Sequence, residues 1–231
     1  MSTPTGDAGS PAARGRVLRA GDHRRMAWRN GGGTTAEIVR SPEGCADDDV
    51  DWRVSIADVE VGGPFSTFPG LDRVIVRLGI APMLLTVDGV EHDLGRFSPL
   101  AFPGESETVA RVPGGTTQDL NLMTRRGRVL GTVAVQELGA GAALAVPAGT
   151  EVVLVVVEGS ALLSRTGTEG SALLSRTGTE GSALLSGTGG RTGLGSHDAF
   201  RQRGPVRLEL GGRGRVAVIE IAGAIPSRDG R

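Results

Sequence analysis

The sequence contains no lysine and no tyrosine, although it is 231 residues long and carries 25 basic side chains. Every basic side chain is therefore an arginine. Without lysine the chain cannot form a Schiff base with pyridoxal phosphate or a carbonyl substrate, and it cannot carry the lysine of a P-loop or kinase site. Without tyrosine it has no phenolic general acid. These two absences exclude several large classes of enzyme.

Net charge, cysteine and long apolar runs are also scarce. The formal charge of −1 gives no bulk attraction to nucleic acid or to an anionic membrane. A single cysteine, Cys45, excludes an intrachain disulfide and favours a reducing compartment. The first twenty residues lack the apolar segment of a signal peptide, and the longest apolar run, Val152 to Val157, is far shorter than the ~20 residues of a membrane span. We expect a soluble, cytoplasmic protein with no nucleic-acid or membrane partner.

Glycine is abundant, and it separates short runs that are rich in Val, Ile, Leu and Thr. The 38 glycines are more than twice the usual share of ~7% and predict many turns. No long stretch has the apolar stripe and caps of a helix. The expected strands are residues 16–20, 34–40, 51–61, 72–80, 83–89, 108–112, 119–126, 128–138, 142–147, 151–159, 206–210 and 215–223. Such spacing predicts an antiparallel sandwich or barrel and not a parallel α/β sheet.

Two segments stand apart from this pattern. Residues 1–14 are rich in small and turn-forming residues and are expected to form a disordered tail. The segment 159–186 is a tandem repeat, in which GSALLSRTGTE occurs twice and its first six residues a third time. We expect the extra copies to form a lengthened loop, because insertions in surface loops cost little free energy. The alternative is that each copy adds a short strand.

The densest group of unusual residues lies in the first half of the chain. In WRNGGGTTAEI (residues 28–38) the glycines allow either a close approach of backbone to a ligand or a bulge in an edge strand, and we favour the structural turn. Alternation along DWRVSIADV (residues 51–59) places Trp52, Val54 and Ile56 on one face and Arg53, Ser55 and Ala57 on the other. One face of this strand is therefore apolar, and the other carries polar groups.

The loop GGPFSTFPG (residues 62–70) precedes a strand that begins with Asp72 and Arg73. Loops of this kind on a β scaffold often line sites. In the alternative interpretation, Phe65 and Phe68 close the end of the sheet, and Arg73 pairs at the surface with Asp72 or a neighbouring carboxylate. The residues of the loop do not decide between these interpretations.

Four blocks, WRNGGGTTAEI, DWRVSIADV, GPFSTFPGLDR and DLNLM (residues 119–123), occur in an order and spacing that resemble the HutD/Ves family. The resemblance covers roughly residues 16–225 and is strongest over 28–126. It implies an all-β bicupin with two jelly-roll or β-barrel halves of the RmlC-like type, which we place at residues 15–130 and 131–226. It also implies an accessory role beside histidine-utilisation genes and not a pathway enzyme.

Metal-dependent cupins place their ligands as His-x-His, then Glu, then a further His. This sequence has only His23, His92 and His197, and none has that spacing. We therefore predict neither a metal nor any other cofactor.

The polar residues of the four blocks suit a small molecule that bears a carboxylate. Arg53 and Arg73 are bidentate donors for a carboxylate, and Glu37 or Asp119 could accept from an amide or amine of the ligand. The predicted ligand-binding residues are Asn30, Thr35, Glu37, Arg53, Ser55, Ser66, Phe68, Arg73, Asp119 and Asn121. The histidine context suggests an intermediate such as urocanate or formylglutamate.

No catalytic residue is predicted. Cys45 lies in an acidic run that disfavours a thiolate, and no GxSxG motif occurs. We expect a non-enzymatic accessory or regulatory protein that binds a small carboxylate metabolite. The alternatives are a metal-independent cupin isomerase or hydrolase that works through Glu37 or Asp119, and a protein-interaction module that uses the repeat loop. Assembly into a homodimer is left open.

Overall fold

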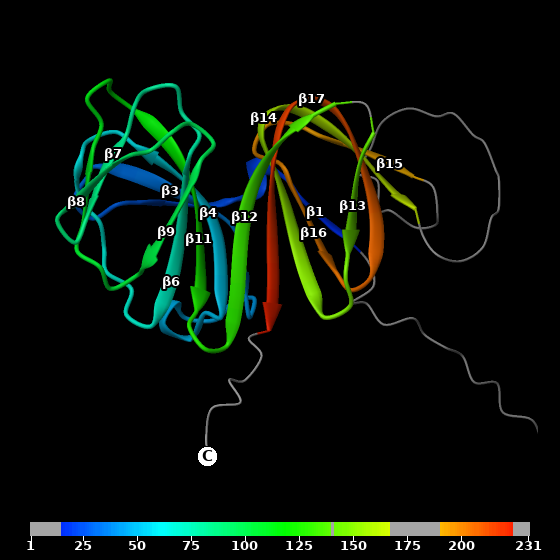
Figure 1. The fold of residues 1–231 in the computed structure, drawn as a ribbon, viewed down its shortest axis with the longest axis horizontal. Helices are drawn as coiled ribbons and strands as arrows, with labels where there is room; N and C mark the ends of the chain where they lie inside the picture. Colours follow the sequence, from blue (N-terminus) through cyan, green and yellow to red (C-terminus); the bar gives the residue numbers. More distant parts are fainter. Residues whose placement is uncertain (1–14, 140, 167–189, 224–231) are drawn as a thin grey trace, which may run out of the picture.

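The computed structural model describes residues 15–139, 141–166 and 190–223. Their regular elements are β-strands and two short 3-10 turns, η2 (Ala20–Asp22) and η3 (Asp47–Asp49), so the all-β expectation is confirmed. Two lobes lie side by side in Figure 1, the N-terminal lobe in blue to green and the C-terminal lobe in green to red. The described part of the chain contains no helix that is long and apolar enough to cross a membrane. The predicted tail at residues 1–14 lies outside the described residues.

Two sheets form the N-terminal lobe. The six-stranded sheet has the order β2 (Arg24–Ala27), β3 (Gly33–Ser41), β4 (Trp52–Val59), β11 (Thr117–Arg125), β6 (Leu71–Arg77) and β9 (Pro99–Pro103). The four-stranded sheet has the order β5 (Gly63–Pro64), β10 (Thr108–Arg111), β7 (Leu84–Val87) and β8 (Val90–Asp93). Ile75, Met83 and Leu85 are fully buried in one apolar cluster of this lobe.

The C-terminal lobe is built on one sheet of seven strands. Its order is β1 (Arg16–Leu18), β16 (Ala199–Arg203), β14 (Thr150–Thr166), β17 (Val206–Gly223) and β12 (Val129–Leu138), with β13 (Ala142–Val146) on β17 and β15 (Arg191–Leu194) on β14. The long strands β14 and β17 pair along nearly their whole length and curve around the lobe (Figure 1). Leu154, Phe200 and Leu208 are fully buried in its interior.

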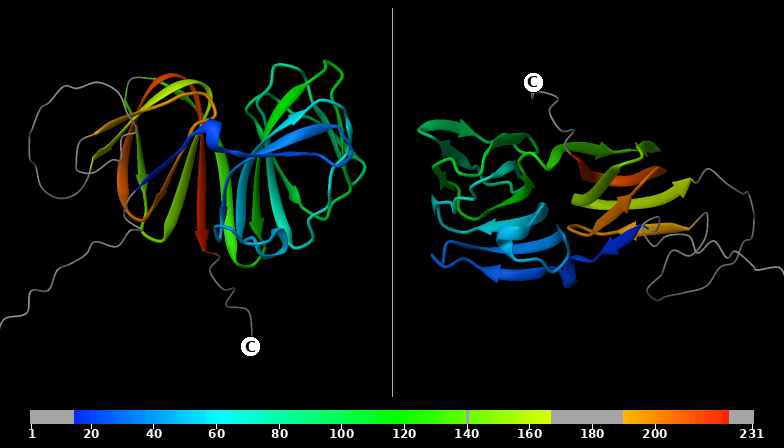
Figure 2. Two further views of the ribbon diagram at one scale, coloured as in Figure 1. Left: turned by 180° about the vertical axis from the view of Figure 1, so that it is seen from behind. Right: turned by 90° about the horizontal axis from the view of Figure 1, so that it is seen from below.

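Three features of this lobe differ from the predicted strands. The expected strands at 206–210 and 215–223 are one continuous strand, β17. The first repeat copy continues β14 as far as Thr166, whereas residues 167–186 of the repeat lie outside the described residues. The first strand, β1, hydrogen-bonds to β16 and thus joins the C-terminal sheet, and Figure 2 shows this blue segment crossing between the lobes. The division between residues 130 and 131 stays a prediction.

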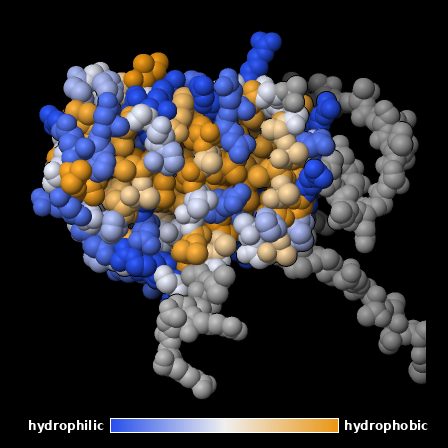
Figure 3. Space-filling model, in the orientation of Figure 1, coloured by the Kyte–Doolittle hydropathy of each residue, from blue (hydrophilic) through white to orange (hydrophobic). Residues whose placement is uncertain are grey.

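The two lobes share a layer of buried apolar side chains. From the N-terminal lobe it receives alternate residues of β4, β6 and β11 together with Ile38 and Val39 of β3. The C-terminal lobe contributes alternate residues of β14 and β17 and single residues of β12 and β16. Its members include Trp52, Val54, Ile56, Val76, Leu120 and Leu122 on one side and Val153, Val155, Val157, Ala217, Ile219 and Ile221 on the other. Figure 3 shows hydrophobic residues along the middle of the molecule, over β11, β12 and β17, where the lobes meet.

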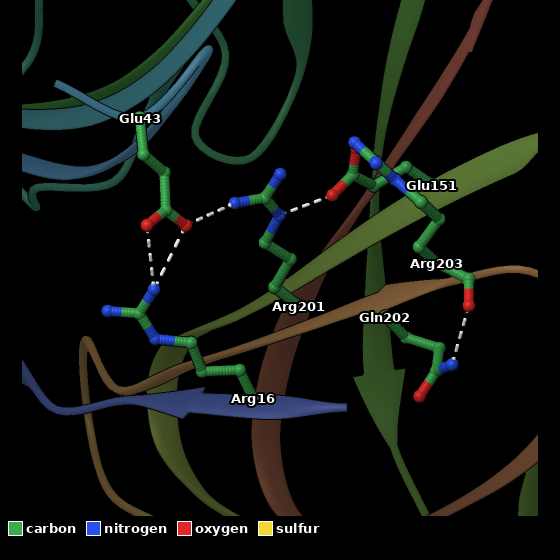
Figure 4. A network of polar contacts seen from close by, with 6 residues as sticks. All are labelled: Arg16, Glu43, Glu151, Arg201, Gln202 and Arg203. Atoms are coloured by element: carbon green, nitrogen blue, oxygen red, sulfur yellow. Dashed lines mark hydrogen bonds and ion pairs between the residues drawn. The ribbon is translucent and has the colours of Figure 1, made fainter. Parts of the chain in front are cut away.

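A network of ion pairs adds a polar link at the edge of this layer (Figure 4). Glu43 lies in the N-terminal lobe and pairs with Arg16 of β1 at 2.9 Å and with Arg201 of β16 at 2.7 Å. Arg201 also pairs with Glu151 of β14 and lies over the ring of Trp52, 5.0 Å from its centroid. Charged residues of both lobes thus pair with each other next to Trp52, which belongs to the apolar layer.

The apolar layer yields a stability prediction. Leu122 is 1% exposed within the layer, so Leu122→Ala leaves a cavity there and should lower the free energy of unfolding by about 2–5 kcal/mol. Leu130 of β12 is 60% exposed, and Leu130→Ala should cost less than about 1 kcal/mol. Urea denaturation of the two variants measures both values. Equal losses in the two variants would contradict the role assigned to the layer.

Candidate functional site

A cavity of about 420 Å³ opens into the N-terminal lobe. Its lining residues come from strands β2, β3, β4, β5, β6 and β11, from the turn between β2 and β3, and from the loop after β5. They are Met26, Ala27, Trp28, Arg29, Asn30, Thr35, Arg53, Ser55, Ala57, Pro64, Phe65, Ser66, Phe68, Arg73, Asp119, Asn121 and Met123. Of the ten ligand-binding residues predicted from the sequence, every one except Glu37 lines this cavity.

Strand alternation places the polar residues in the cavity. On β4, Trp52, Val54 and Ile56 enter the layer between the lobes, whereas Arg53, Ser55 and Ala57 point the other way and line the cavity, as predicted. On β11, Leu120 and Leu122 join the layer, while Asp119, Asn121 and Met123 line the cavity. Met123 is the register partner of both Arg53 and Arg73, so the two arginines flank β11 from either side.

Arg73 is a buried cation with few hydrogen-bond partners. It is 3% exposed, and the hydrogen bond from its Nη1 to the backbone oxygen of Ser66 is long at 3.5 Å. Its guanidinium lies over the rings of Phe65, Phe68 and Phe102, between 5.2 and 5.5 Å from their centroids. Burial lowers the pKa of Arg73 to about 10, with Arg53 acting in the same direction and Asp119 opposing. The arginine stays charged at neutral pH and keeps donors free.

Asp119 is the acidic group of the cavity. It is 1% exposed, and its Oδ1 atom has no hydrogen-bond partner. Burial raises the pKa of Asp119 to about 7, Asp58 adds to this effect and Arg73 opposes it. Near neutral pH this carboxyl therefore populates both its protonated and its ionised form.

Four buried polar atoms without a hydrogen-bond partner belong to this one cavity. They are Nε of Arg53, Nε of Arg73, Oδ1 of Asp119 and Oδ1 of Asn121. Buried polar groups in native proteins nearly always have partners, so a cluster of unpartnered ones needs an explanation. Two of the atoms are donors on cations and two are acceptors. A ligand that carries both an anionic acceptor and a donor would satisfy all four.

Two aromatic residues of the cavity lining, Trp28 and Phe65, contact each other. Trp28 Nε1 donates to Thr35 Oγ1 at 2.8 Å, and the Trp28 ring meets Phe65 edge to face at 5.9 Å. The glycines between Trp28 and Thr35 are required by the backbone conformation of this turn, in line with the structural interpretation. A Cβ atom on Gly33 would lie 2.2 Å from the backbone oxygen of Asp58, and Gly31 has φ +69. Asn30 also serves this turn, since its Oδ1 accepts from the amide of Gly32 at 3.0 Å.

Glu37 is not brought into this cavity. It lines a second cavity of about 300 Å³, together with Arg40, and its carboxylate pairs with the Arg40 guanidinium. The physical reason is a β-bulge after Glu37, which places Arg40 on the same side of the strand as Glu37. The alternative of an enzyme that works through Glu37 in the N-terminal cavity does not fit this arrangement.

The alternative interpretation of Arg73 as a surface ion-pair partner is wrong. Asp72 pairs with Arg126 at 2.7 Å, and Arg73 points into the lobe because neighbouring residues of a strand face opposite ways. Sequence reasoning missed Trp28, Phe65 and Met123 as lining residues, although all lie in the quoted motifs. Alternation with Asp119 and Asn121 could have identified Met123.

The donor set does not fit the metal that many cupins hold. The polar groups in the cavity are guanidiniums, a carboxyl, amides and hydroxyls, and no imidazole lines it. Buried guanidiniums repel a cation, and a cupin metal needs several imidazole ligands. In the described ranges no three His, Cys, Asp or Glu side chains are grouped to hold an ion.

Known proteins resemble the chain along most of its length. A family model described as HutD matches residues 20–216. An uncharacterized 21.2 kDa protein in the hutC 3′ region of Pseudomonas putida is 48% identical over 109 residues, which are 46% of this chain and 56% of that protein. The chain thus spans little more than half of this curated relative's length.

Solved structures extend the similarity to the fold. HutD from Pseudomonas fluorescens SBW25 is 29% identical with a TM-score of 0.69, and the match covers 91% of this chain and all of that chain. Oxalate decarboxylase from Bacillus subtilis, at 10% identity, has a TM-score of 0.60 over 95% of this chain and 79% of its own, which bears on the fold alone. The predicted bicupin fold is confirmed.

The raised pKa of Asp119 predicts a pH-dependent stability. Below pH about 4 the Asp119 carboxyl is protonated in both the folded and the unfolded chain. Between pH about 4 and pH about 7 only the unfolded chain loses this proton. The free energy of unfolding therefore falls as the pH rises through this range. Asparagine cannot ionise. Asp119→Asn should therefore stabilise the protein by about 2–3 kcal/mol more at pH 8 than at pH 5.

Urea denaturation at the two pH values measures this difference. Asp93→Asn, at an exposed carboxyl of β8, is the matched control. An equal pH dependence in the two variants would argue against a buried, destabilised Asp119 carboxylate.

Proposed function

This chain belongs to the HutD family, and from that premise we propose that its N-terminal cavity binds a small carboxylate metabolite without converting it. The observation that carries the proposal is the cluster of four buried, unpartnered polar atoms on Arg53, Arg73, Asp119 and Asn121. In the folded protein these atoms have no hydrogen-bond partners, and a bound ligand would provide the partners.

The chemistry of the lining indicates which groups the ligand carries. A carboxylate placed between Arg53 and Arg73 would accept charge-assisted hydrogen bonds, which are strong in a site shielded from water. A donor on the ligand would meet the free oxygens of Asp119 and Asn121. Trp28, Phe65 and Phe68 offer aromatic surface for a planar group. The volume, about 420 Å³, suits a small molecule.

Two metabolites of histidine breakdown combine these groups. Urocanate has a carboxylate and an imidazole N–H on a planar frame, and N-formylglutamate has carboxylates and an amide N–H. The name of the Pseudomonas putida relative places it in a hutC 3′ region, which favours this context for the present chain. The structure of the Pseudomonas fluorescens relative is described as a formate condition, so formate serves as the smallest carboxylate probe.

Removal of the buried cation tests the proposal. Arg73→Met keeps much of the side-chain length but removes the guanidinium, so affinity for urocanate or N-formylglutamate should fall at least about thirtyfold, equivalent to about 2 kcal/mol. Isothermal titration calorimetry of wild type and variant measures the change. Arg126→Met is the control, because Arg126 is an exposed arginine that pairs with Asp72 and Glu105.

Two results would count against the binding role. One is a wild-type protein that binds none of the three acids at millimolar concentration. The other is an Arg73→Met variant that binds as tightly as Arg126→Met.

A second candidate function, a metal-independent isomerase or hydrolase, is favoured by one observation. Asp119 has a pKa of about 7 and faces the same cavity as Arg73, so it could move a proton to or from a bound acid at neutral pH. Conversion of urocanate or N-formylglutamate by wild type, followed by NMR, and its loss in Asp119→Asn would favour catalysis. A bound acid recovered unchanged would leave the binding role in place.

A further inference from the structure

We propose that Arg40 is a positioning residue that keeps Arg53 available to the ligand by holding Glu37 away from it. This inference rests on the proposed carboxylate-binding function of the N-terminal cavity. Its basis is the arrangement of Glu37, Arg40 and Arg53 on the adjacent strands β3 and β4.

The three side chains lie side by side across the two strands. Arg40 is the register partner of Arg53, and Glu37 is the register partner of Ser55. Register partners of antiparallel strands point to the same side of the sheet, so Glu37 lies diagonally across from Arg53. The negative charge of Glu37 acts directly on Arg53, where it opposes the lowering of the arginine's pKa by burial.

A β-bulge makes this arrangement. In a regular strand Glu37 and Arg40, three residues apart, would face opposite sides. The register shifts between Glu37 and Val39, so that one extra residue is inserted and Arg40 returns to the side of Glu37. Ile38 and Val39 are then both buried in the layer between the lobes.

Arg40 donates hydrogen bonds from two of its nitrogens to the two carboxylate oxygens of Glu37. Its Nε donates to Oε1 of Glu37 at 2.8 Å, and its Nη2 donates to Oε2. Its own position is fixed because Nη1 donates to the backbone oxygen of Cys45 at 2.9 Å and Nη2 pairs with Asp47 at 2.9 Å. Both side chains are largely buried, Arg40 at 7% and Glu37 at 10% exposure.

Arg53, by contrast, has no hydrogen-bond acceptor within the described structure. Its Nε is buried without a partner, and its guanidinium lies over the Phe68 ring at 5.9 Å. A half-buried guanidinium beside a carboxylate normally pairs with it. If Arg40 were absent, Glu37 would take Arg53 as its partner, since the other facing arginine, Arg24 of β2, is solvent-exposed. The internal carboxylate would then compete with the ligand.

The test removes Arg40 alone and together with its partner. In Arg40→Met, the affinity for urocanate and for N-formylglutamate should fall about tenfold or more, because Glu37 competes for Arg53. In the double variant Glu37→Gln/Arg40→Met the competitor is gone, and affinity should return to within about threefold of wild type. Arg16→Met is the matched control, since Arg16 lines the same second cavity but pairs with Glu43.

A crystal structure of Arg40→Met gives a readout that needs no ligand. We expect the Arg53 guanidinium within about 4 Å of the Glu37 carboxylate, which is the distance of an ion pair. Calorimetry tests the proposed binding function, and the variant structure tests the role of Arg40 independently of it. If wild type binds no acid, the proposed function fails, and the ion pair in the variant structure still decides the role of Arg40.

Three results would overturn the inference. Arg40→Met could bind the acids as tightly as Arg16→Met, the double variant could stay as weak as the single one, or Arg53 could remain unpaired in the variant structure. Should Arg40→Met fail to fold, Glu37→Gln decides the question. Its affinity should equal or exceed that of wild type, and a tenfold weaker affinity would make Glu37 a ligand contact instead.

Discussion

Strict alternation along β4, β6 and β11 is the constraint on which the rest of the structure depends. Each of these strands has one apolar face, which packs against the sheet of the C-terminal lobe, and one face that lines the cavity. The same residues that fix the register through Trp52, Val54 and Leu122 thereby fix the positions of Arg53, Asp119 and Asn121. A shift of one residue would exchange the two faces, burying charges between the lobes. The apolar layer therefore holds the polar groups in place.

This arrangement permits a cavity that is unfavourable by itself. Burying Arg73 and Asp119 without ideal partners costs free energy, and the raised pKa of Asp119 expresses that cost. The extensive apolar layer between the lobes offsets it. Functional sites are commonly places where stability is given up so that polar groups await a ligand. The lining of rings around Arg73 fits this view, because the rings exclude water without neutralising the charge.

Local sequence reasoning predicts the alternating strands well and the contacts between distant strands poorly. The faces of residues 52–57 follow from period two, and the candidate residues of four separate motifs converge in one cavity. Strands β2, β5, β8, β9, β15 and β16 were not predicted, since they are short or start near turns and their pairing is set by the neighbouring strand. The pairing of β1 with β16 joins residues about 180 positions apart, a contact that no local pattern encodes.

The bulge after Glu37 is the one break in alternation that changes the chemistry of the site. Period two from Thr35 predicts that Glu37 faces the cavity, and the site would then hold a second acid besides Asp119. The extra residue brings Arg40 beside Glu37, so the negative charge of this residue is neutralised within its own strand. The charged residues that line the cavity are Arg29, Arg53, Arg73 and Asp119, and the pKa of Asp119 is raised to about 7. The bulge thus keeps a negative charge out of the cavity, and no sequence motif marks the inserted residue.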